Sequence, residues 1–244
     1  MSTKKTLKKA IVGMALGDGH IDRSGGLLFS HSLSQEMYAR AKYRILSERF
    51  YVSEPKLEIK NTTFGVFERI TCRASLGKFG KNLRDNLYVD NHKIAPMKML
   101  KFMGVEGLLF LFLDDGTLSI SKRTRNRVGR EAYLSVEGFD TQSRKNIINF
   151  LNNLGINSKD APYKTRGKSY VRIRISAIGM RKMISLLHSS SYLNEVAMAM
   201  KYKLCPKYVT NRIDKSLDLV RSFNLCKESC SILYNKESSC VFKK

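Results

Sequence analysis

The chain has 244 residues, of which 43% are hydrophobic and only four are proline, so it can bury a normal core and is not a disordered basic tail. Lysine and arginine total 44 against 21 aspartates and glutamates, which gives a formal net charge of +23. A charge of this size makes a compact protein repel itself unless the partner is a polyanion, and nucleic acid is therefore the first candidate.

Membrane insertion and secretion are not expected. The longest apolar stretch, Val105 to Leu113, is interrupted by Glu106 and falls short of the roughly 20 residues that span a bilayer. The N-terminus lacks the apolar core of a secretory signal, and an odd number of irregularly spaced cysteines argues for a reducing compartment. We expect an intracellular protein, working in the cytoplasm of a bacterial or phage-infected host or in an organelle.

In chain order, the first predicted element is an apolar helix that ends in Leu16-Gly17-Asp18-Gly19. A strand around Leu27 to His31 follows, and then the capping-box pattern Ser32-x-x-Gln35. The next helix has an apolar side made of Tyr38, Ala41 and Ile45. A later return strand alternates the apolar Ile70, Cys72 and Ala74 with the polar Arg69, Thr71 and Arg73.

The same order of elements is then repeated. A second apolar helix ends in Leu113-Asp114-Asp115-Gly116, and Asp115 follows Asp18 by 97 positions (115 − 18). After it come an alternating strand (Ala132, Leu134, Val136), a helix capped by Asp140 with the stripe Ile147, Ile148, Leu151 and Leu154, and a left-handed stop at Gly155. The last strand alternates Val171, Ile173 and Ile175 with Arg172, Arg174 and Ser176. The chain therefore reads as a duplicated unit.

The alternating strands indicate a nucleic-acid surface. A half-buried antiparallel sheet with arginine at every second position presents a row of charges on its solvent face, and such a face suits a DNA groove. The predicted DNA-contacting residues are Arg69, Arg73, Lys122, Arg123, Arg125, Arg127, Arg172 and Arg174. For any single arginine the alternative is a solvated edge whose charge prevents aggregation.

The two helix ends indicate metal-assisted chemistry. An aspartate at the C-terminus of a helix lies near the negative end of the helix dipole and is disfavoured there by itself. A carboxylate beside free carbonyl oxygens does offer the hard oxygen ligands that magnesium accepts, and two such ends side by side would make a phosphodiester-cleaving site. The alternative is that each Asp-Gly pair only ends a helix and begins a turn.

These residues resemble a known family. Ile11-Val12-Gly13-Met14-Ala15-Leu16-Gly17-Asp18-Gly19 and Leu108-Leu109-Phe110-Leu111-Phe112-Leu113-Asp114-Asp115-Gly116 are similar to the two signature helices of the LAGLIDADG homing endonucleases. The resemblance extends from Leu7 to about Leu204. Position three of the motif is Gly13 in one copy and Phe110 in the other, and position seven is Gly17 against Asp114, which is expected of a single-chain member with an asymmetric target.

The resemblance implies an α+β fold of two pseudo-symmetric αββαββα lobes, with the signature helices packed at their interface and an antiparallel DNA-binding sheet in each lobe. It implies Asp18 and Asp115 as catalytic metal ligands and Mg²⁺ or Mn²⁺ as the cation, with the carbonyls of Gly17 and Asp114 as additional ligands. Asp114 itself is either an acid behind the ligands or a rival of Asp115. Lys93, in His92-Lys93-Ile94-Ala95-Pro96, and Lys203, in Met200-Lys201-Tyr202-Lys203-Leu204, are implied as electrostatic or water-positioning residues.

We therefore expect a first lobe at residues 1–100, a second lobe at 101–204 and a basic extension at 205–244. The extension contains Lys207, Arg212, Lys215 and Arg221, and a short helix is expected near Ser216 to Phe223. The expected function is site-specific, metal-dependent double-strand cleavage of a long DNA target by a monomer. The alternatives are a maturase that binds intron RNA and a DNA-binding protein without catalysis.

Overall fold

The computed structural model describes residues 3–62, 65–124, 127–165 and 167–204, and the side chains among them except those of 62, 120–124 and 127–130. The predicted extension at 205–244, with its basic residues and short helix, lies outside the described residues. No helix among the described residues is long and apolar enough to cross a membrane.

The first half of the chain follows the order αββαββα with one short added strand. Its elements are α1 (Lys4–Leu16), β1 (His20–Ile21), β2 (Gly26–Ser32), the 3-10 turn η1 (Leu33–Gln35), α2 (Glu36–Ser47), β3 (Tyr51–Val52), β4 (Lys56–Thr62), β5 (Gly65–Ser75) and α3 (Gly77–Leu87). A small hairpin of β6 (Tyr88–Val89) and β7 (His92–Lys93) joins it to the second half.

The second half repeats that order. Its elements are α4 (Met97–Asp115), β8 (Gly116–Thr124), β9 (Arg127–Leu134), α5 (Thr141–Asn153), β10 (Ser158–Thr165), β11 (Lys168–Ile175) and α6 (Ala177–Leu187), followed by the short helices α7 (Leu193–Ala197) and α8 (Lys201–Leu204). The predicted α+β fold with two αββαββα units is therefore confirmed.

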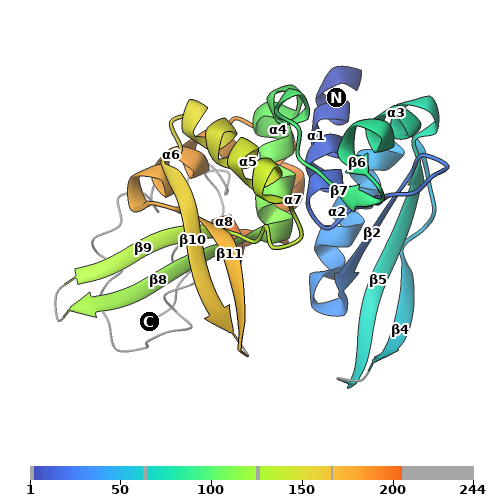
Figure 1. Ribbon diagram of the computed structural model, residues 1–244. Helices are drawn as coiled ribbons and strands as arrows, with labels where there is room; N and C mark the ends of the chain where they lie inside the picture. The colour runs from blue at the N-terminus through green and yellow to red at the C-terminus, as the bar shows by residue number, and fades with distance from the viewer. Residues whose placement is uncertain (1–2, 63–64, 125–126, 166, 205–244) are drawn as a thin grey trace, which may run out of the picture.

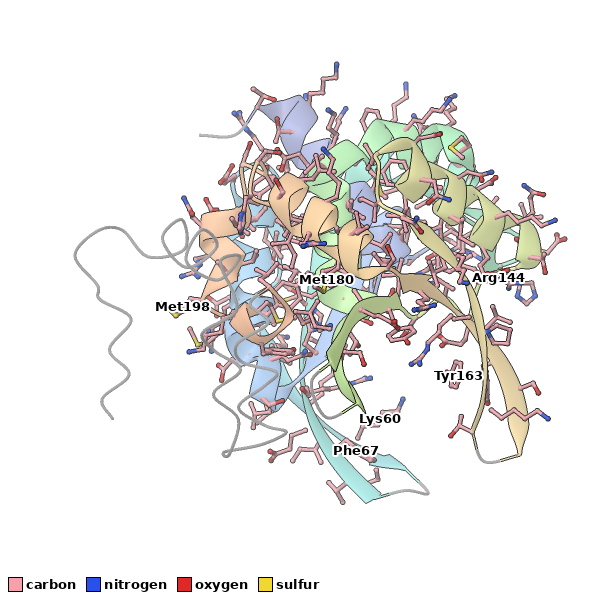
Figure 2. All side chains as sticks on the ribbon, turned by 90° about the vertical axis from the view of Figure 1, so that its left-hand side faces the viewer. Lys60, Phe67, Arg144, Tyr163, Met180 and Met198 are labelled. Carbon is pink, nitrogen blue, oxygen red and sulfur yellow. The ribbon has the colours of Figure 1, made fainter. Side chains whose placement is uncertain are left out.

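Each half builds one antiparallel sheet. The strand order is β1-β2-β5-β3 in the first sheet, with β4 also pairing β5, and β10-β11-β9-β8 in the second. Figure 1 shows the two sheets on either side of the central helices α1 and α4, with the β4–β5 and β10–β11 hairpins extending to the same side, away from the outer helices. In the turned view of Figure 2, Phe67 of β5 and Tyr163 of β10 mark these two hairpins.

Strand alternation sets which side of each sheet faces the core, since successive side chains point to opposite faces. Ile70, Cys72 and Ala74 of β5 and Ile173 and Ile175 of β11 are buried, while Val171 is partly exposed. The polar partners in the alternation face away from the helices. The sequence prediction of one apolar and one cationic face is confirmed for both return strands.

The predicted boundaries of the helix after Asp140 are confirmed in the second half, whereas the predicted helix start in the first half is wrong. The Asp140 carboxylate accepts a hydrogen bond from the Ser143 backbone N–H, and Gly155 has a φ of 75°, as expected. The predicted capping box at Ser32 is wrong, because Ser32 precedes the 3-10 turn η1, its side chain makes no capping hydrogen bond, and α2 starts only at Glu36. The 3-10 turn separates Ser32 from the first residue of α2, so Ser32 cannot cap that helix.

Helix α4 bends at Gly104, which has a φ of 54° and a ψ of −147°. A residue with side chain is strained at a positive φ, so glycine allows the chain to turn there and begin the apolar helix of the second motif. The predicted boundary between residues 100 and 101 falls inside α4, ahead of this bend. The division into lobes at that point stays a prediction.

Candidate active site

Helices α1 and α4 lie side by side at the centre of the molecule and touch through glycines (Figure 1). A Cβ atom on Gly13 would lie 1.9 Å from the carbonyl oxygen of Gly107, and one on Gly107 would lie 2.7 Å from the carbonyl oxygen of Lys9. Both positions therefore need glycine. The residue opposite Gly13 is Gly107, just before the second nonapeptide, while Phe110 packs in the core.

The two motif aspartates lie at the C-terminal ends of these helices. Asp18 follows the C-cap residue Gly17 of α1 and has 40% of its side chain exposed, and Asp115 is the last residue of α4. Burial raises the pKa of Asp115 to about 8, and the charges of Asp114 and Asp18 act in the same direction. Burial and the charge of Asp114 also raise the pKa of Asp18. The predicted pair is therefore close enough for the charge of Asp18 to act on the carboxyl group of Asp115.

Asp114 has a different environment from Asp18 and Asp115, because its side chain is completely buried. Its Oδ1 accepts hydrogen bonds from Lys42 Nζ at 2.6 Å and from the Tyr38 hydroxyl at 2.8 Å. Its Oδ2 accepts one from the backbone N–H of Asp18 at 3.2 Å. The buried Lys42 Nζ also lies 3.0 Å from Nε2 of His31. Asp114 is thus held behind Asp18 by side chains of α2.

Lys93 and Lys203 donate hydrogen bonds to backbone carbonyls at the C-terminal ends of the two helices. Lys93 Nζ donates to the carbonyl oxygens of Gly17 and Gly19, both at 2.8 Å. Lys203 Nζ donates to the carbonyl oxygens of Leu113 at 2.6 Å and Asp114 at 2.8 Å. Burial lowers the pKa of both lysines, although the three aspartates act against that shift.

The two ammonium groups satisfy carbonyls that a helix C-terminus leaves without intrahelical partners. They also place positive charge beside the carboxylates. The carbonyls of Gly17 and Asp114, predicted as additional metal ligands, each accept one of these lysine bonds. The structure thus brings the predicted catalytic and metal-binding residues to one place, and their individual roles stay predictions.

The donor set of Asp18 and Asp115 fits a hard divalent cation. Carboxylate oxygens are the ligands that Mg²⁺ prefers, with water in the remaining positions, and Asp18 is exposed enough to admit water. Burial is the main cause of the raised pKa of Asp115, and the negative charges of Asp114 and Asp18 add to it, so a bound cation would offset the repulsion between these carboxylates.

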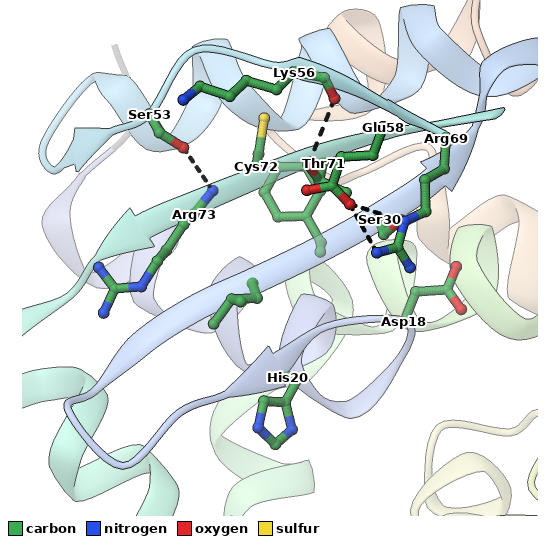
Figure 3. A pocket seen from close by; sticks show the side chains of 12 residues that line it. Asp18, His20, Ser30, Ser53, Lys56, Glu58, Arg69, Thr71, Cys72 and Arg73 are labelled. Atoms are coloured by element: carbon green, nitrogen blue, oxygen red, sulfur yellow. Dashed lines mark hydrogen bonds and ion pairs between the residues drawn. The ribbon is translucent and has the colours of Figure 1, made fainter. Parts of the chain in front are cut away.

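The outer face of the first sheet is hollowed beside Asp18. Figure 3 shows this concavity, of about 420 Å³, which is lined by Asp18, His20, Leu28, Phe29, Ser30, Ser53, Lys56, Glu58, Arg69, Thr71, Cys72 and Arg73. Arg69 Nη2 lies 2.7 Å from Glu58 Oε2, and Arg73 Nη2 lies 2.8 Å from Asp22 Oδ2. The two arginines predicted to contact DNA therefore border the same hollow as the predicted catalytic acid, and each is held by a carboxylate.

The second sheet holds its arginines in a similar way. The guanidinium carbon of Arg172 lies 3.6 Å from the ring centroid of Tyr133, and Arg174 Nε donates to Glu131 Oε2 at 2.8 Å. The predicted contacts Lys122 and Arg123 of β8 and Arg127 of β9 belong to described strands, but their side chains are outside the described part, as is the whole of Arg125. DNA contact by these residues stays a prediction.

Sequence reasoning missed Lys42 and did not give His31 and Tyr38 a role in the site. Lys42 lies on the buried side of α2 among Tyr38, Ala41 and Ile45. A lysine is almost never fully buried unless it is paired. A charged residue inside an apolar helix stripe was therefore the available signal, and Asp114, the unusual acid at motif position seven, was the partner to look for.

Comparisons with known proteins agree with this geometry. A family model described as the LAGLIDADG DNA endonuclease family matches residues 8–183. No curated protein sequence gives a significant match.

Among solved structures, the homing endonuclease I-WcaI bound to its DNA recognition sequence is similar with a TM-score of 0.66 and 20% sequence identity, covering 84% of this chain and 88% of that one. I-DmoI in complex with DNA and Ca has a TM-score of 0.43 and 14% identity, covering 77% and 92%. The meganuclease I-SmaMI bound to uncleavable DNA has a TM-score of 0.46 and 10% identity, covering 86% and 97%. The likeness to I-WcaI concerns the fold.

Proposed function

Because this chain belongs to the LAGLIDADG DNA endonuclease family, we propose that it is a site-specific homing endonuclease that makes a metal-dependent double-strand break in a long DNA target. One observation supports this proposal above the others. Asp18 and Asp115 lie at the C-terminal ends of two abutting helices, and the charge of Asp18 contributes to the raised pKa of Asp115. Two carboxylates so placed, between two sheets with arginines on their outer faces, suit the cleavage of a phosphodiester backbone.

Asp18 and Asp115 would hold Mg²⁺ or Mn²⁺. When bound, the cation would polarise a water molecule and stabilise negative charge on the phosphodiester. Lys93 and Lys203 would hold the two helix ends in place through the carbonyls of Gly17, Gly19, Leu113 and Asp114, and their ammonium charges would favour the approach of the phosphate. Both roles need the lysines to remain charged.

The sheets would hold the DNA. Arg69 and Arg73 of the first sheet and Arg172 and Arg174 of the second are each fixed by a carboxylate or a tyrosine ring before any ligand binds. Side chains that are already held in one conformation lose less conformational entropy on binding, which favours selective contacts. Since both halves belong to one chain, binding as a monomer is expected. The intracellular location predicted from the sequence stays a prediction.

Cleavage by Asp→Asn variants tests the proposal. The substrate is a duplex that joins the sequences flanking the reading frame, and linear and nicked products are followed with Mg²⁺, with Mn²⁺ and with a chelator. We expect Asp18→Asn and Asp115→Asn each to lose at least about 100-fold in cleavage rate, and binding of the same duplex with the chelator present to change little. Asp85→Asn, an exposed residue of α3, is the control and should cut normally.

Full cleavage by either active-site variant would remove the assigned site. Binding with steep salt dependence but no cutting under any cation would leave the DNA-binding protein without catalysis as the function. The maturase alternative has no specific observation in its favour among the described residues, and a splicing assay on a host intron would be its test.

A further inference from the structure

Asp18, one of the two predicted catalytic aspartates, also lies close to two other groups that can bind metal. Single ligand atoms of Asp18, His31 and Asp114 all lie within 4.8 Å of one another. Taken by itself, this cluster would compete with the pair Asp18 and Asp115 for a divalent cation. A fourth group changes that, because the ammonium of Lys42 contacts two of its three members, Asp114 and His31.

The hydrogen bonds of Lys42 determine the state of His31. An ammonium has three donors and no acceptor, so the His31 Nε2 atom, 3.0 Å from Lys42 Nζ, must accept. The proton of the neutral ring then lies on Nδ1, which is 3.6 Å from Asp18 Oδ2. A protonated ring nitrogen has no lone pair for a metal, and Nε2 uses its lone pair on Lys42. His31 is thereby excluded as a ligand.

Asp114 is occupied in the same way. Its carboxylate accepts from Lys42 Nζ, from the Tyr38 hydroxyl and from the Asp18 N–H, and its side chain is fully buried. The Lys42 side chain is also fully buried, so the pair is shielded from water and is not exchanged easily. The ammonium thus provides the positive charge that a cation would bring.

We propose that Lys42 is a positioning residue whose ammonium replaces a cation beside Asp114 and His31, so that a divalent metal is confined to Asp18 and Asp115. The confinement to that pair rests on the proposed function, whereas the replacement of a cation by Lys42 does not. The matched position in the second half supports the assignment: Ile147 of α5 is buried there and the residue at motif position seven of the first helix is Gly17. The lysine is present only in the half where the buried acid needs it.

Lys42→Met tests this directly, because methionine keeps an unbranched apolar side chain and removes the charge. Without metal, the variant should unfold roughly 6–20 °C below wild type, since Asp114 loses its buried partner. Mn²⁺ should restore a large part of that loss and should raise the midpoint of the variant more than that of wild type, in which only the site at Asp18 and Asp115 is expected to bind the ion. Mn²⁺ titration followed by electron paramagnetic resonance should find about one additional bound ion per chain in the variant.

Two controls separate this result from general effects of substitution. Lys42→Met combined with Asp114→Asn removes the acid as well, and it should bind no additional Mn²⁺. Ile147→Met changes the matched position without changing charge, and it should behave as wild type toward Mn²⁺. Equal Mn²⁺ binding by wild type and Lys42→Met would overturn the proposal.

If Lys42→Met does not fold even with Mn²⁺, nitrogen chemical shifts of the His31 ring decide. In the wild-type protein the proton should lie on Nδ1, and in the folded double variant the ring should move toward the Nε2–H form. A wild-type proton on Nε2 would contradict the proposal. These measurements need no DNA, so a wild type that fails to cut would count against the proposed nuclease and not against the role of Lys42.

Discussion

The two halves of the molecule have the same backbone order, but different side chains pack behind their central helices. From β2 to α2 the first half aligns with the second at an offset of 105 residues (147 − 42), and several of the aligned pairs are buried in both halves. The first half has His31, Tyr38 and Lys42 where the second has Val136, Ser143 and Ile147. His31 and Lys42 are therefore matched by apolar residues, and Tyr38 is matched by a serine.

The difference follows from one position on the opposing helix. A Cβ atom on Gly17 would lie 2.5 Å from Asp114 Oδ2, so only one of the two helices can carry a side chain at that point. A buried carboxylate costs several kcal/mol unless it is paired and hydrogen-bonded. In the second half, where the opposing helix has no such acid, the apolar Val136 and Ile147 occupy the positions of His31 and Lys42. We infer that Asp114 and its hydrogen-bond partners on α2, Tyr38 and Lys42, form one structural unit.

The largest expected effect comes from the contact that both halves share. Gly13→Ala places a Cβ 1.9 Å from the Gly107 carbonyl oxygen, and backbone cannot move aside as a flexible side chain can. We expect a loss of about 4 kcal/mol or more in the free energy of unfolding, measured by urea denaturation. Gly138→Ala is the control, because nothing lies within 4 Å of its Cβ and its φ is not positive. Equal stability of the two variants would mean that the helices do not meet at Gly13.

The helices and strands of this arrangement could largely be predicted from the sequence, because the patterns that mark them involve residues close together in the chain. The alternation around Ile173 and the cap at Asp140 depend on neighbouring residues, and the structure confirms both. The contact of Gly13 with Gly107 could not be found by aligning the two motifs, because that alignment pairs Gly13 with Phe110. Helix register depends on which surfaces fit together in three dimensions.

The site was predicted in part for the same reason. Asp18 and Asp115 are marked by their motif, whereas Lys42 is one of 44 basic residues and its role depends on a carboxylate 72 positions away. Only the apolar stripe around Lys42 distinguishes it. Pairings over such a distance are not encoded in any local pattern.

The second effect concerns the two motif aspartates and is read from the pH dependence of stability without metal. The pKa of Asp115 is raised from 3.8 to about 8, mainly by burial. The neutral acid is favoured in the folded state, so its contribution to stability is complete below pH 4 and is lost as the pH rises through 8. Asp115→Asn cannot ionise and should become more stable than wild type over that interval.

We expect the difference to reach about 3 kcal/mol at pH 9, which is roughly half of what the shift gives at about 1.36 kcal/mol per unit, because a real site relaxes. Urea denaturation with a chelator present, between pH 4 and pH 9, measures it. Asp18→Asn should show a smaller change in the same direction, since its side chain is 40% exposed. A stability difference for Asp115→Asn that does not vary with pH would contradict the raised pKa.

A third effect compares the matched pair Tyr38 and Ser143. The Tyr38 hydroxyl donates to the charged Asp114, whereas Ser143 Oγ accepts from the neutral backbone N–H of Ala95 at 2.9 Å. Hydrogen bonds to charged groups contribute more, so Tyr38→Phe should cost about 2 kcal/mol and Ser143→Ala about 1 kcal/mol. In an Asp114→Asn background the cost of Tyr38→Phe should fall, while that of Ser143→Ala should not change. Equal costs in both backgrounds would separate Tyr38 from the buried unit.

The smallest effect distinguishes the arginines on the two outer faces. Arg73 is paired with Asp22 and has 44% of its side chain exposed, while Arg174 has 32% exposed and is paired with Glu131, whose side chain is only 11% exposed. Removing the arginine from the more buried carboxylate leaves a charge that water solvates poorly. Arg174→Ala should therefore cost about 1 kcal/mol of stability and Arg73→Ala about 0.5 kcal/mol.

DNA binding by the same two variants should not follow that order. If both arginines contact DNA, each alanine variant should weaken duplex binding by roughly tenfold and lower the salt dependence, whatever its effect on stability. Titrations of labelled duplex at several salt concentrations measure this. A loss of binding in one variant alone would mean that the two sheets do not contact the target equivalently. The backbone would then be repeated in the two halves without a matching repeat of the DNA contacts.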